Sequence, residues 1–157
     1  GGTSLVLRRI AMDLDGWAEL DRRGRGLTVG RRLSDGAPLS GTSERDDPDF
    51  TAIKNGLPVI PASAHVARAR KTGDRDRFLR RAYNYDDPPN GAAISDSGLL
   101  FAAFQRDIDA QFVPVQRRLA EHDALNEWTV PIGSAVYAIL PGVREGEVLG
   151  SALHERP

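Results

Sequence analysis

The sequence predicts an α+β fold, in which one antiparallel sheet carries helices on one of its faces. Two observations carry this prediction. Four short apolar or alternating segments have the period of β-strands, and two other segments repeat their apolar residues at helical spacing. The chain has 157 residues, of which 40% are hydrophobic, and this is enough for a single domain over residues 1–157.

The first elements are a strand and a helix. Residues 5–10 form a short apolar-rich run that is typical of a strand. Residues 13–23 repeat their apolar side chains at helical spacing. Because aspartate often caps a helix start and glycine often follows a helix end, we expect Asp15 to begin this helix and Gly24 to end it.

A long segment without periodicity follows, over residues 24–61, and it is rich in Gly, Pro, Asp and Ser. Segments of this length inside a compact domain are usually functional or disordered. Residues 62–70 then predict a short helix that bears His65. We therefore expect a long loop insertion that leads to this histidine.

The second half predicts two strands, a helix and a last strand. The strands are expected at residues 78–85, 99–105 and 134–140, and the helix at 107–122, where Pro114 is tolerable only in the first turn. The order is therefore β-α-insertion-β-β-α-β. This order predicts a ferredoxin-like antiparallel sheet with helices on one face and the long loop insertion before its second strand.

Composition excludes several classes of function. A net charge of −1 and a pI near 6.3 give no electrostatic case for binding nucleic acid or an anionic membrane. The apolar stretches are shorter than ten residues, so membrane insertion is not expected. The absence of cysteine excludes disulfides and thiolate-bound metals. The chain starts at Gly1 without a signal-peptide pattern, so we expect a processed start or one piece of a longer polypeptide.

Three histidines are the candidates for imidazole chemistry. His122 ends a predicted helix beside charged residues, and His154 lies near the C-terminus, so both are expected to be solvated. His65 differs because small and apolar residues flank it. An imidazole in such surroundings can bind iron, although a lone histidine is more often structural.

Two adjacent arginines in a predicted strand form the second candidate feature. Arg80 and Arg81 must point to opposite faces of the sheet, so at most one of them can face a given pocket. Such an arginine could stabilise developing negative charge, or it could simply pair with Asp86 or Asp87 nearby. The residues by themselves leave both interpretations open.

Several stretches carry a family resemblance when they are taken together and in order. They resemble the C-terminal half of the dye-decolourising (DyP-type) haem peroxidases, and most of all their secreted, twin-arginine-exported branch. The matching stretches cover nearly the whole chain and comprise residues 1–10, 29–39, 60–66, 79–85, 98–105, 111–119 and 125–128.

The resemblance implies a b-type haem and a set of site residues. By the family's motifs, His65 is the proximal iron ligand and Arg80 the distal arginine, with Arg81 as the alternative if the register differs by one residue. It places Leu99 and Phe101 on the distal side, and these share a strand face because they are two residues apart. The carboxylate that bonds the proximal imidazole falls on Glu127, or less closely on Asn126.

One departure from the family pattern concerns the distal aspartate. The family carries this residue in a Gly-X-X-Asp-Gly motif of its N-terminal half, and Asp35-Gly36 does not fit that motif because Gly30 stands five residues before Asp35. The resemblance therefore implies that an N-terminal fragment of the same peroxidase supplies the aspartate as a partner.

The expected function is that of a peroxidase using hydrogen peroxide to oxidise dyes and phenolic compounds. Electrons would pass through aromatic residues, for which the sequence offers Trp128, Tyr137, Tyr83 and Tyr85. Relatives with deferrochelatase activity supply the alternative, which is a haem-binding, iron-releasing protein without peroxidase turnover. A third alternative is a nonenzymatic ferredoxin-like module. The resemblance implies a secreted or cell-envelope location, and homo-oligomer formation stays open.

Overall fold

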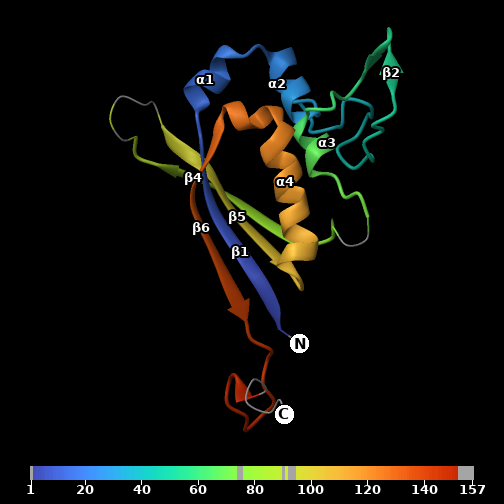
Figure 1. The fold of residues 1–157 in the computed structure, drawn as a ribbon. Helices are drawn as coiled ribbons and strands as arrows, with labels where there is room; N and C mark the ends of the chain where they lie inside the picture. The colour runs from blue at the N-terminus through green and yellow to red at the C-terminus, as the bar shows by residue number, and fades with distance from the viewer. Residues whose placement is uncertain (1, 74–75, 90, 92–94, 152–157) are drawn as a thin grey trace.

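A four-stranded antiparallel sheet organises the chain (Figure 1). The computed structural model describes residues 2–73, 76–89, 91 and 95–151. The strands are β1 (Thr3–Met12), β4 (Leu79–Asp87), β5 (Asp96–Gln105) and β6 (Thr129–Ile139). They lie in the order β4-β5-β1-β6, and each neighbouring pair is antiparallel. The mixed class of helices and antiparallel sheet that the sequence predicts is confirmed.

All four predicted strands exist, and three of them are clearly longer than predicted. Strand β1 extends beyond residues 5–10 at both ends, and β6 begins five residues before the predicted Ser134. Pro131 explains the missed start, because proline lacks a ladder donor and therefore argues against a strand. The structure accommodates it on the edge strand β6, beside a register shift opposite Arg9 and Ile10.

Two helices, α1 (Leu14–Glu19) and α2 (Arg22–Val29), replace the single helix that the sequence predicts at residues 13–23. The expectation that Asp15 caps the helix and Gly24 ends it is wrong. Asp13 caps α1 by accepting the Gly16 N–H at 3.0 Å, and Asp21 caps α2 by accepting the N–H of Gly24 at 2.7 Å. Each aspartate satisfies N–H groups that a helix start leaves without partners, so the second cap begins a new helix.

The remaining helices lie on one side of the sheet (Figure 1). They are α3 (His65–Ala69), a π-helical turn η2 (Ile108–Phe112), α4 (Val113–His122) and a 3₁₀ turn η3 (Ala124–Glu127). The helix predicted at residues 107–122 is shorter in the structure, because residues 108–112 form the π-helical turn and α4 begins at Val113. This start puts Pro114 in the first turn of α4, where its missing N–H has no partner to lose. Among the described residues, none of the helices is long and apolar enough to span a membrane.

A long loop runs from α2 to α3 and contains a small hairpin of β2 (Ile53–Lys54) and β3 (Leu57–Pro58). Its turn residues Asn55 and Gly56 both have positive φ, at 52° and 77°. This is the backbone that a two-residue hairpin turn of the I′ type requires.

The two faces of the sheet have different surroundings. Side chains directly opposed in an antiparallel pair share a face, so Arg8, Phe101 and Ala82 lie together on the face toward α4, which we call the pocket face. The opposite face is the outer sheet face. It exposes large apolar side chains from all four strands, which include Leu7, Leu79, Tyr83, Leu100, Val130, Tyr137 and Ile139.

The buried apolar core of the described chain is small. Val6 of β1 and Ala103 of β5 are opposed on the pocket face, and Val115 of α4 is also buried. Ile60 and Ala64 add a second buried group at the start of α3. Much of the pocket face is therefore available to line a cavity.

Candidate haem-binding site

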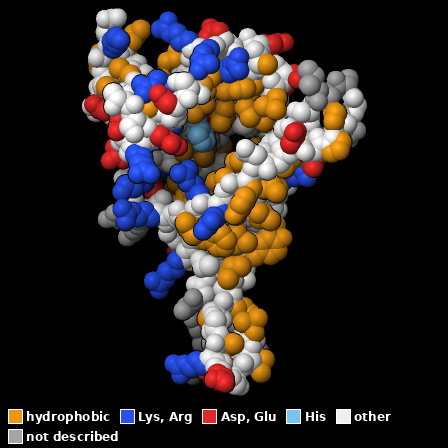
Figure 2. All heavy atoms as spheres, turned by 180° about the vertical axis from the view of Figure 1, so that it is seen from behind, with side chains coloured by type: hydrophobic (Ala, Val, Ile, Leu, Met, Phe, Trp, Pro, Cys, Tyr) orange, Lys and Arg blue, Asp and Glu red, His pale blue; other side chains and the backbone are white. Residues whose placement is uncertain are grey.

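A large cavity of about 2140 Å³ is lined by the pocket face of the sheet and by α3 and α4. Figure 2 shows a hollow in the surface with hydrophobic side chains around it and a histidine within it. Pockets for small molecules usually measure roughly 300–1,000 Å³. This cavity is therefore large enough for a planar cofactor and for an access channel to that cofactor.

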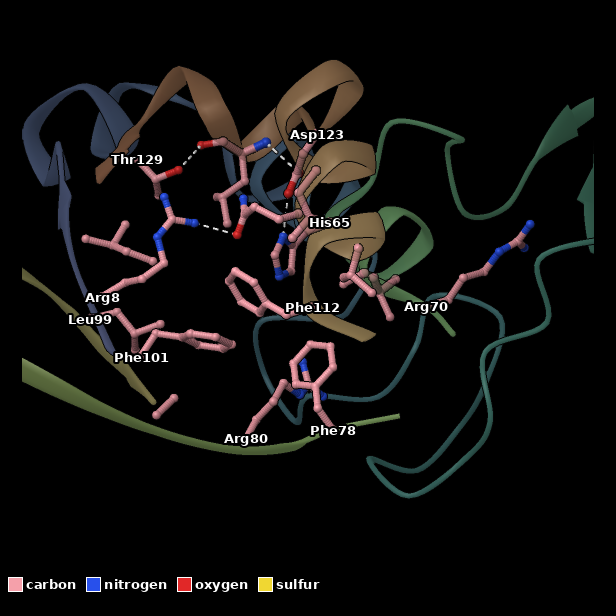
Figure 3. A pocket seen from close by; sticks show the side chains of 18 of the residues that line it. Arg8, His65, Arg70, Phe78, Arg80, Leu99, Phe101, Phe112, Asp123 and Thr129 are labelled. Carbon is pink, nitrogen blue, oxygen red and sulfur yellow. Dashed lines mark hydrogen bonds and ion pairs between the residues drawn. The ribbon is translucent and has the colours of Figure 1, made fainter. Parts of the chain in front are cut away.

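The sheet provides one wall of this cavity. Arg80 of β4 lies opposite Ala103 on the pocket face, while Arg81 lies opposite Ala102 on the outer sheet face. Leu99 and Phe101 of β5 also line the cavity, and Figure 3 shows them and Arg80 around the same space. Of the two arginines, the structure thus places Arg80 on the side of Leu99 and Phe101.

The sequence leaves open whether a carboxylate near the arginines pairs with them. Asp87 instead forms an ion pair with Arg9 at 2.7 Å, and Asp86 accepts a hydrogen bond from the Ser97 hydroxyl. Arg9 lies on the outer sheet face, where it also stacks over the Tyr85 ring at 4.1 Å. Both aspartates are therefore engaged by other residues of the sheet.

His65 stands at the opposite wall and contacts a buried carboxylate. Its Nδ1 lies 2.5 Å from Oδ2 of Asp123, whose side chain is 3% exposed, whereas the His65 side chain is 36% exposed. Because an ionised carboxylate only accepts hydrogen bonds, Nδ1 donates to it. Among the described residues no hydrogen bond engages Nε2, and His65 lines the cavity (Figure 3).

Asp123 is held in place by the turn that it forms. Its N–H closes α4 on the Leu119 carbonyl at 3.1 Å, and its Oδ1 accepts the N–H of Leu125 at 3.0 Å, which begins η3. The next residue, Ala124, donates its N–H to the Ser63 carbonyl just before α3, at 2.9 Å. This backbone hydrogen bond therefore joins the segment after Asp123 to the segment before His65, in addition to the contact between their side chains.

Gly30 sets the distance between α2 and α3. It ends α2 with φ of 85°, and a Cβ built on it would lie 2.3 Å from Cγ1 of Val66 and 3.2 Å from the Cβ of Ala64. Both the positive φ and this close approach require glycine. Since Val66 follows His65 directly, this contact determines how deeply α3 and its histidine sit.

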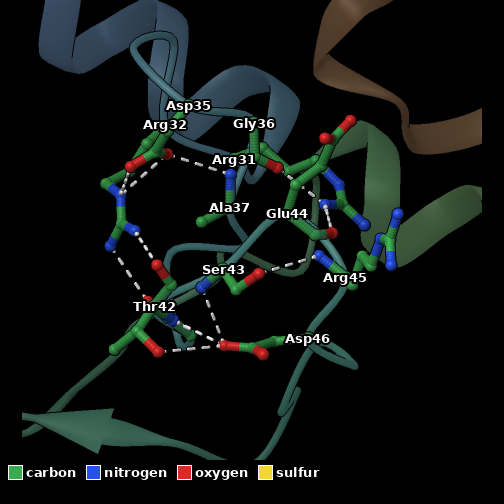
Figure 4. A network of polar contacts seen from close by, with 11 residues as sticks. Arg31, Arg32, Asp35, Gly36, Ala37, Thr42, Ser43, Glu44, Arg45 and Asp46 are labelled. Carbon is green, nitrogen blue, oxygen red and sulfur yellow. Dashed lines mark hydrogen bonds and ion pairs between the residues drawn. The ribbon is translucent and has the colours of Figure 1, made fainter.

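The long loop is ordered by a network of polar contacts (Figure 4). Arg32 binds Asp35 at 3.1 Å and also the carbonyls of Gly41 and Thr42. Asp46 accepts the N–H groups of Thr42 and Ser43 at 2.7 and 2.9 Å, and these bonds hold the pKa of its carboxyl below its usual range. The loop carries Asp47, Pro48 and Phe50 into the wall of the cavity.

The residues at the cavity are suited to an iron whose ligands come mostly from a cofactor and not from the protein. The described residues contain no group of three or more His, Asp, Glu or Cys that could hold a metal ion. A porphyrin supplies four nitrogen ligands and needs one axial protein ligand, such as an imidazole. The single Nε2 on the cavity side, with Phe101 and Phe112 lining the same space, matches this requirement.

The sequence-based choice of the imidazole's partner is wrong. The resemblance implies Glu127 or Asn126, but Asp123 holds that position. Asn126 instead donates to the Leu119 carbonyl at 2.8 Å at the end of α4, and Glu127 is exposed at the end of η3. The sequence offers one signal for Asp123, since an aspartate directly after a helix is suited to cap the next turn.

Comparison with known proteins identifies a family and named relatives. The family model "Dyp-type peroxidase, C-terminal" matches residues 1–144. The chain is 44% identical to the dye-decolorizing peroxidase of Thermobifida fusca, covering 99% of this chain and 36% of that protein. It is 34% identical to the deferrochelatase of an Escherichia coli strain, covering 98% of this chain and 37% of that protein.

Solved structures agree with this assignment. The DyP-type peroxidase from Cellulomonas bogoriensis matches with a TM-score of 0.95 and 57% identity, over 99% of this chain and 44% of that one. Ferric DtpA from Streptomyces lividans matches with a TM-score of 0.89 and 38% identity, over 99% of this chain and 43% of that one. The chain thus spans less than half the length of these relatives, and it belongs to the Dyp-type peroxidase family.

Proposed function

We propose that the chain is the haem-binding part of a peroxidase that uses hydrogen peroxide to oxidise dyes and phenolic compounds. One observation carries the proposal most directly. His65 directs one nitrogen to a buried carboxylate and leaves Nε2 at a cavity whose opposite wall carries Arg80. Family membership, together with the likeness to ferric DtpA, supports haem b as the group that occupies the cavity.

His65 would hold the iron of this haem, and bound haem supplies the iron that exchanges electrons with peroxide. Asp123 has two effects on the ligand. By accepting the proton of Nδ1 it fixes the tautomer that leaves Nε2 unprotonated, and it makes the imidazole a stronger electron donor. Because Asp123 is also fixed by its turn, the ring orientation is set before any cofactor binds.

Arg80 would act on the other side of the cofactor. A guanidinium keeps its charge at all relevant pH values and donates several hydrogen bonds from a rigid plane. On the pocket face it can stabilise negative charge on peroxide oxygens as their bond breaks. Leu99 and Phe101 would keep water away from this region, which strengthens the electrostatic contribution.

An N-terminal part of the same protein would supply the proton-transferring aspartate. Two observations support such a partner. The exposed outer sheet face is apolar, and the chain's total accessible surface of 11041 Å² exceeds the roughly 7,800 Å² expected for a compact protein of this mass. The strand order suits a ferredoxin-like unit, which we propose to pack against the remaining part of the protein.

The route of electrons to bulky substrates is proposed to include Trp128. This side chain forms an edge-to-face pair with Trp17, with ring centroids 5.0 Å apart. Trp128 directly precedes Thr129, which lines the cavity. We also propose a secreted or cell-envelope location, and the support for it is the resemblance of the sequence to the exported branch of the family.

The deferrochelatase relative supports a second candidate function, in which the chain binds haem and releases its iron without peroxidase turnover. Both functions require His65 to bind the haem iron, but they differ in their need for Arg80. Iron removal does not involve peroxide charge, whereas peroxide cleavage depends on it.

The test combines a haemin titration with dye bleaching. We expect the chain to develop a Soret band with haemin and His65→Ala to lose it. Together with the N-terminal part, Arg80→Leu should lower peroxide-dependent bleaching by about a hundredfold or more while keeping the Soret band. Arg81→Leu, which removes the neighbouring cation from the outer sheet face, is the matched control. Its bleaching rate per assembled complex should equal that of the wild type, with the amount of complex measured by sedimentation.

Each other outcome has a definite meaning. A haem-loaded protein that bleaches no dye but releases iron would favour the deferrochelatase function. A wild-type chain that shows no Soret band with haemin would contradict both functions.

A further inference from the structure

Arg8 lines the cavity from β1, one of the two central strands of the sheet. It lies on the pocket face of β1, opposite Phe101 of β5 and Ser134 of β6. Its Nη1 donates a hydrogen bond to Oε1 of Gln116 on α4, and both residues line the cavity, so this bond connects the sheet to α4. Figure 3 shows the Arg8 side chain at the cavity near Thr129.

The partner of this guanidinium is neutral. The ion pairs within the described part of the chain join Arg9, Arg32, Arg118 and His65 to aspartates, and Arg8 is in none of them. Its Nε is buried and has no hydrogen-bond partner among the described residues. Burial also lowers the pKa of Arg8 from its usual value, because it removes water from the charged guanidinium.

A partly buried cation without an anion is costly, and an anion that pairs with it in good geometry lowers this cost. The cavity that Arg8 lines is the site where we place haem, and haem carries two carboxylates at its edge. An arginine offers the planar pair of donors that a carboxylate accepts. A ligand carboxylate would therefore supply what the protein itself does not provide at this position.

We propose that Arg8 is the residue that binds a carboxylate of the haem and thereby sets the orientation of the cofactor, with Gln116 holding the guanidinium in place. This inference rests on the proposed binding of haem, and it adds the recognition of the haem edge. The alternative role for Arg8 is a purely structural tie between β1 and α4.

Haemin and haemin dimethyl ester separate these roles because the ester lacks the negative charges. Affinities for both are measured by Soret titration of the wild-type chain and of variants. We expect the wild type to prefer haemin over its ester, and Arg8→Met to lose about tenfold or more in haemin affinity with little change for the ester.

Two further variants serve as controls. One tests the contact between Arg8 and Gln116, and the other tests the loss of a positive charge elsewhere at the cavity. Gln116→Met breaks the contact with Arg8 but keeps the cation, so it should still prefer haemin over the ester, with a smaller loss of haemin affinity than Arg8→Met because the guanidinium is only less firmly positioned. Arg106→Met removes another cation that lines the cavity but is exposed, and it should behave as the wild type does. Circular dichroism and the thermal midpoint of each apoprotein show whether the variants remain folded.

Three outcomes would overturn the inference. Equal weakening of both porphyrins in Arg8→Met and Gln116→Met would assign Arg8 to the structural tie alone. An unchanged haemin affinity in Arg8→Met would show that Arg8 does not take part in haemin binding. A wild-type chain that binds neither porphyrin would refute the haem proposal and this inference together, so the two failures are distinguishable.

Discussion

Asp123 shows how one side chain can serve the fold and the site at the same time. One of its carboxylate oxygens caps the turn η3, and the other accepts the His65 proton. Its burial means that neither bond is exchanged for water. The same residue therefore determines both the position and the electronic character of the proposed iron ligand.

We expect Asp123→Asn to lower haem affinity by about tenfold to a hundredfold, because an amide is a weaker and uncharged acceptor for the Nδ1 proton. The reduction potential of the bound iron should rise as the imidazole donates less electron density. Soret titration and a redox titration measure the two effects. A loss of cap stability alone would lower the thermal midpoint without moving the potential.

Glu127→Gln is the matched control for this prediction. It removes the same charge four residues away, at an exposed position that the structure separates from His65. Its affinity and potential should equal those of the wild type. A shifted potential in Glu127→Gln, with none in Asp123→Asn, would show that the pairing has been assigned to the wrong residue.

At the scale of elements, the long loop is ordered without regular secondary structure. Arg31 and Arg32 donate to loop carbonyls, which satisfies backbone groups that no helix or strand engages. Asp46 accepts from two backbone N–H groups on the other side of the network. The cavity wall that this loop builds therefore depends on a few charged side chains.

This dependence predicts an acid-sensitive contribution to stability. The N–H groups of Thr42 and Ser43 lower the pKa of Asp46 in the folded state. A lowered folded pKa stabilises the fold above the unfolded value of about 3.9, and the contribution is lost as pH falls through the folded pKa. Asp46→Asn should thus lower the thermal midpoint at pH 7 more than at pH 3.

Asp47→Asn is the control, since it removes the same charge at an exposed neighbour outside this network. Thermal unfolding followed by circular dichroism at both pH values gives the comparison. An Asp46→Asn variant whose deficit is as large at pH 3 as at pH 7 would show that the carboxylate charge does not stabilise the loop.

At the scale of the whole molecule, the outer sheet face exposes apolar side chains that a compact protein usually covers. Tyr83 and Leu79 of the edge strand β4 are 58% and 60% exposed. Contiguous apolar patches of this kind are typical of surfaces that another protein segment covers. The proposed N-terminal part would cover it.

We expect Leu100→Ser, on this face, to reduce binding of the dye ANS by the isolated chain while leaving its circular dichroism unchanged. The same substitution should weaken association with the N-terminal part, measured by sedimentation. Val6→Ser is the contrast, because Val6 is buried on the other face and its substitution should unfold the chain. Unchanged association of Leu100→Ser would place the partner elsewhere.

The strands, the helix α4 and the candidate histidine could all be predicted from the sequence alone, because hydrophobic periodicity and short motifs are local properties. The opposite orientations of Arg80 and Arg81 were predictable as well, since strand side chains alternate. Two contacts needed the folded chain: Asp123 reaches His65 across 58 positions, and Arg8 meets Gln116. They arise from the packing of α3 and α4 over the sheet, which no local pattern records.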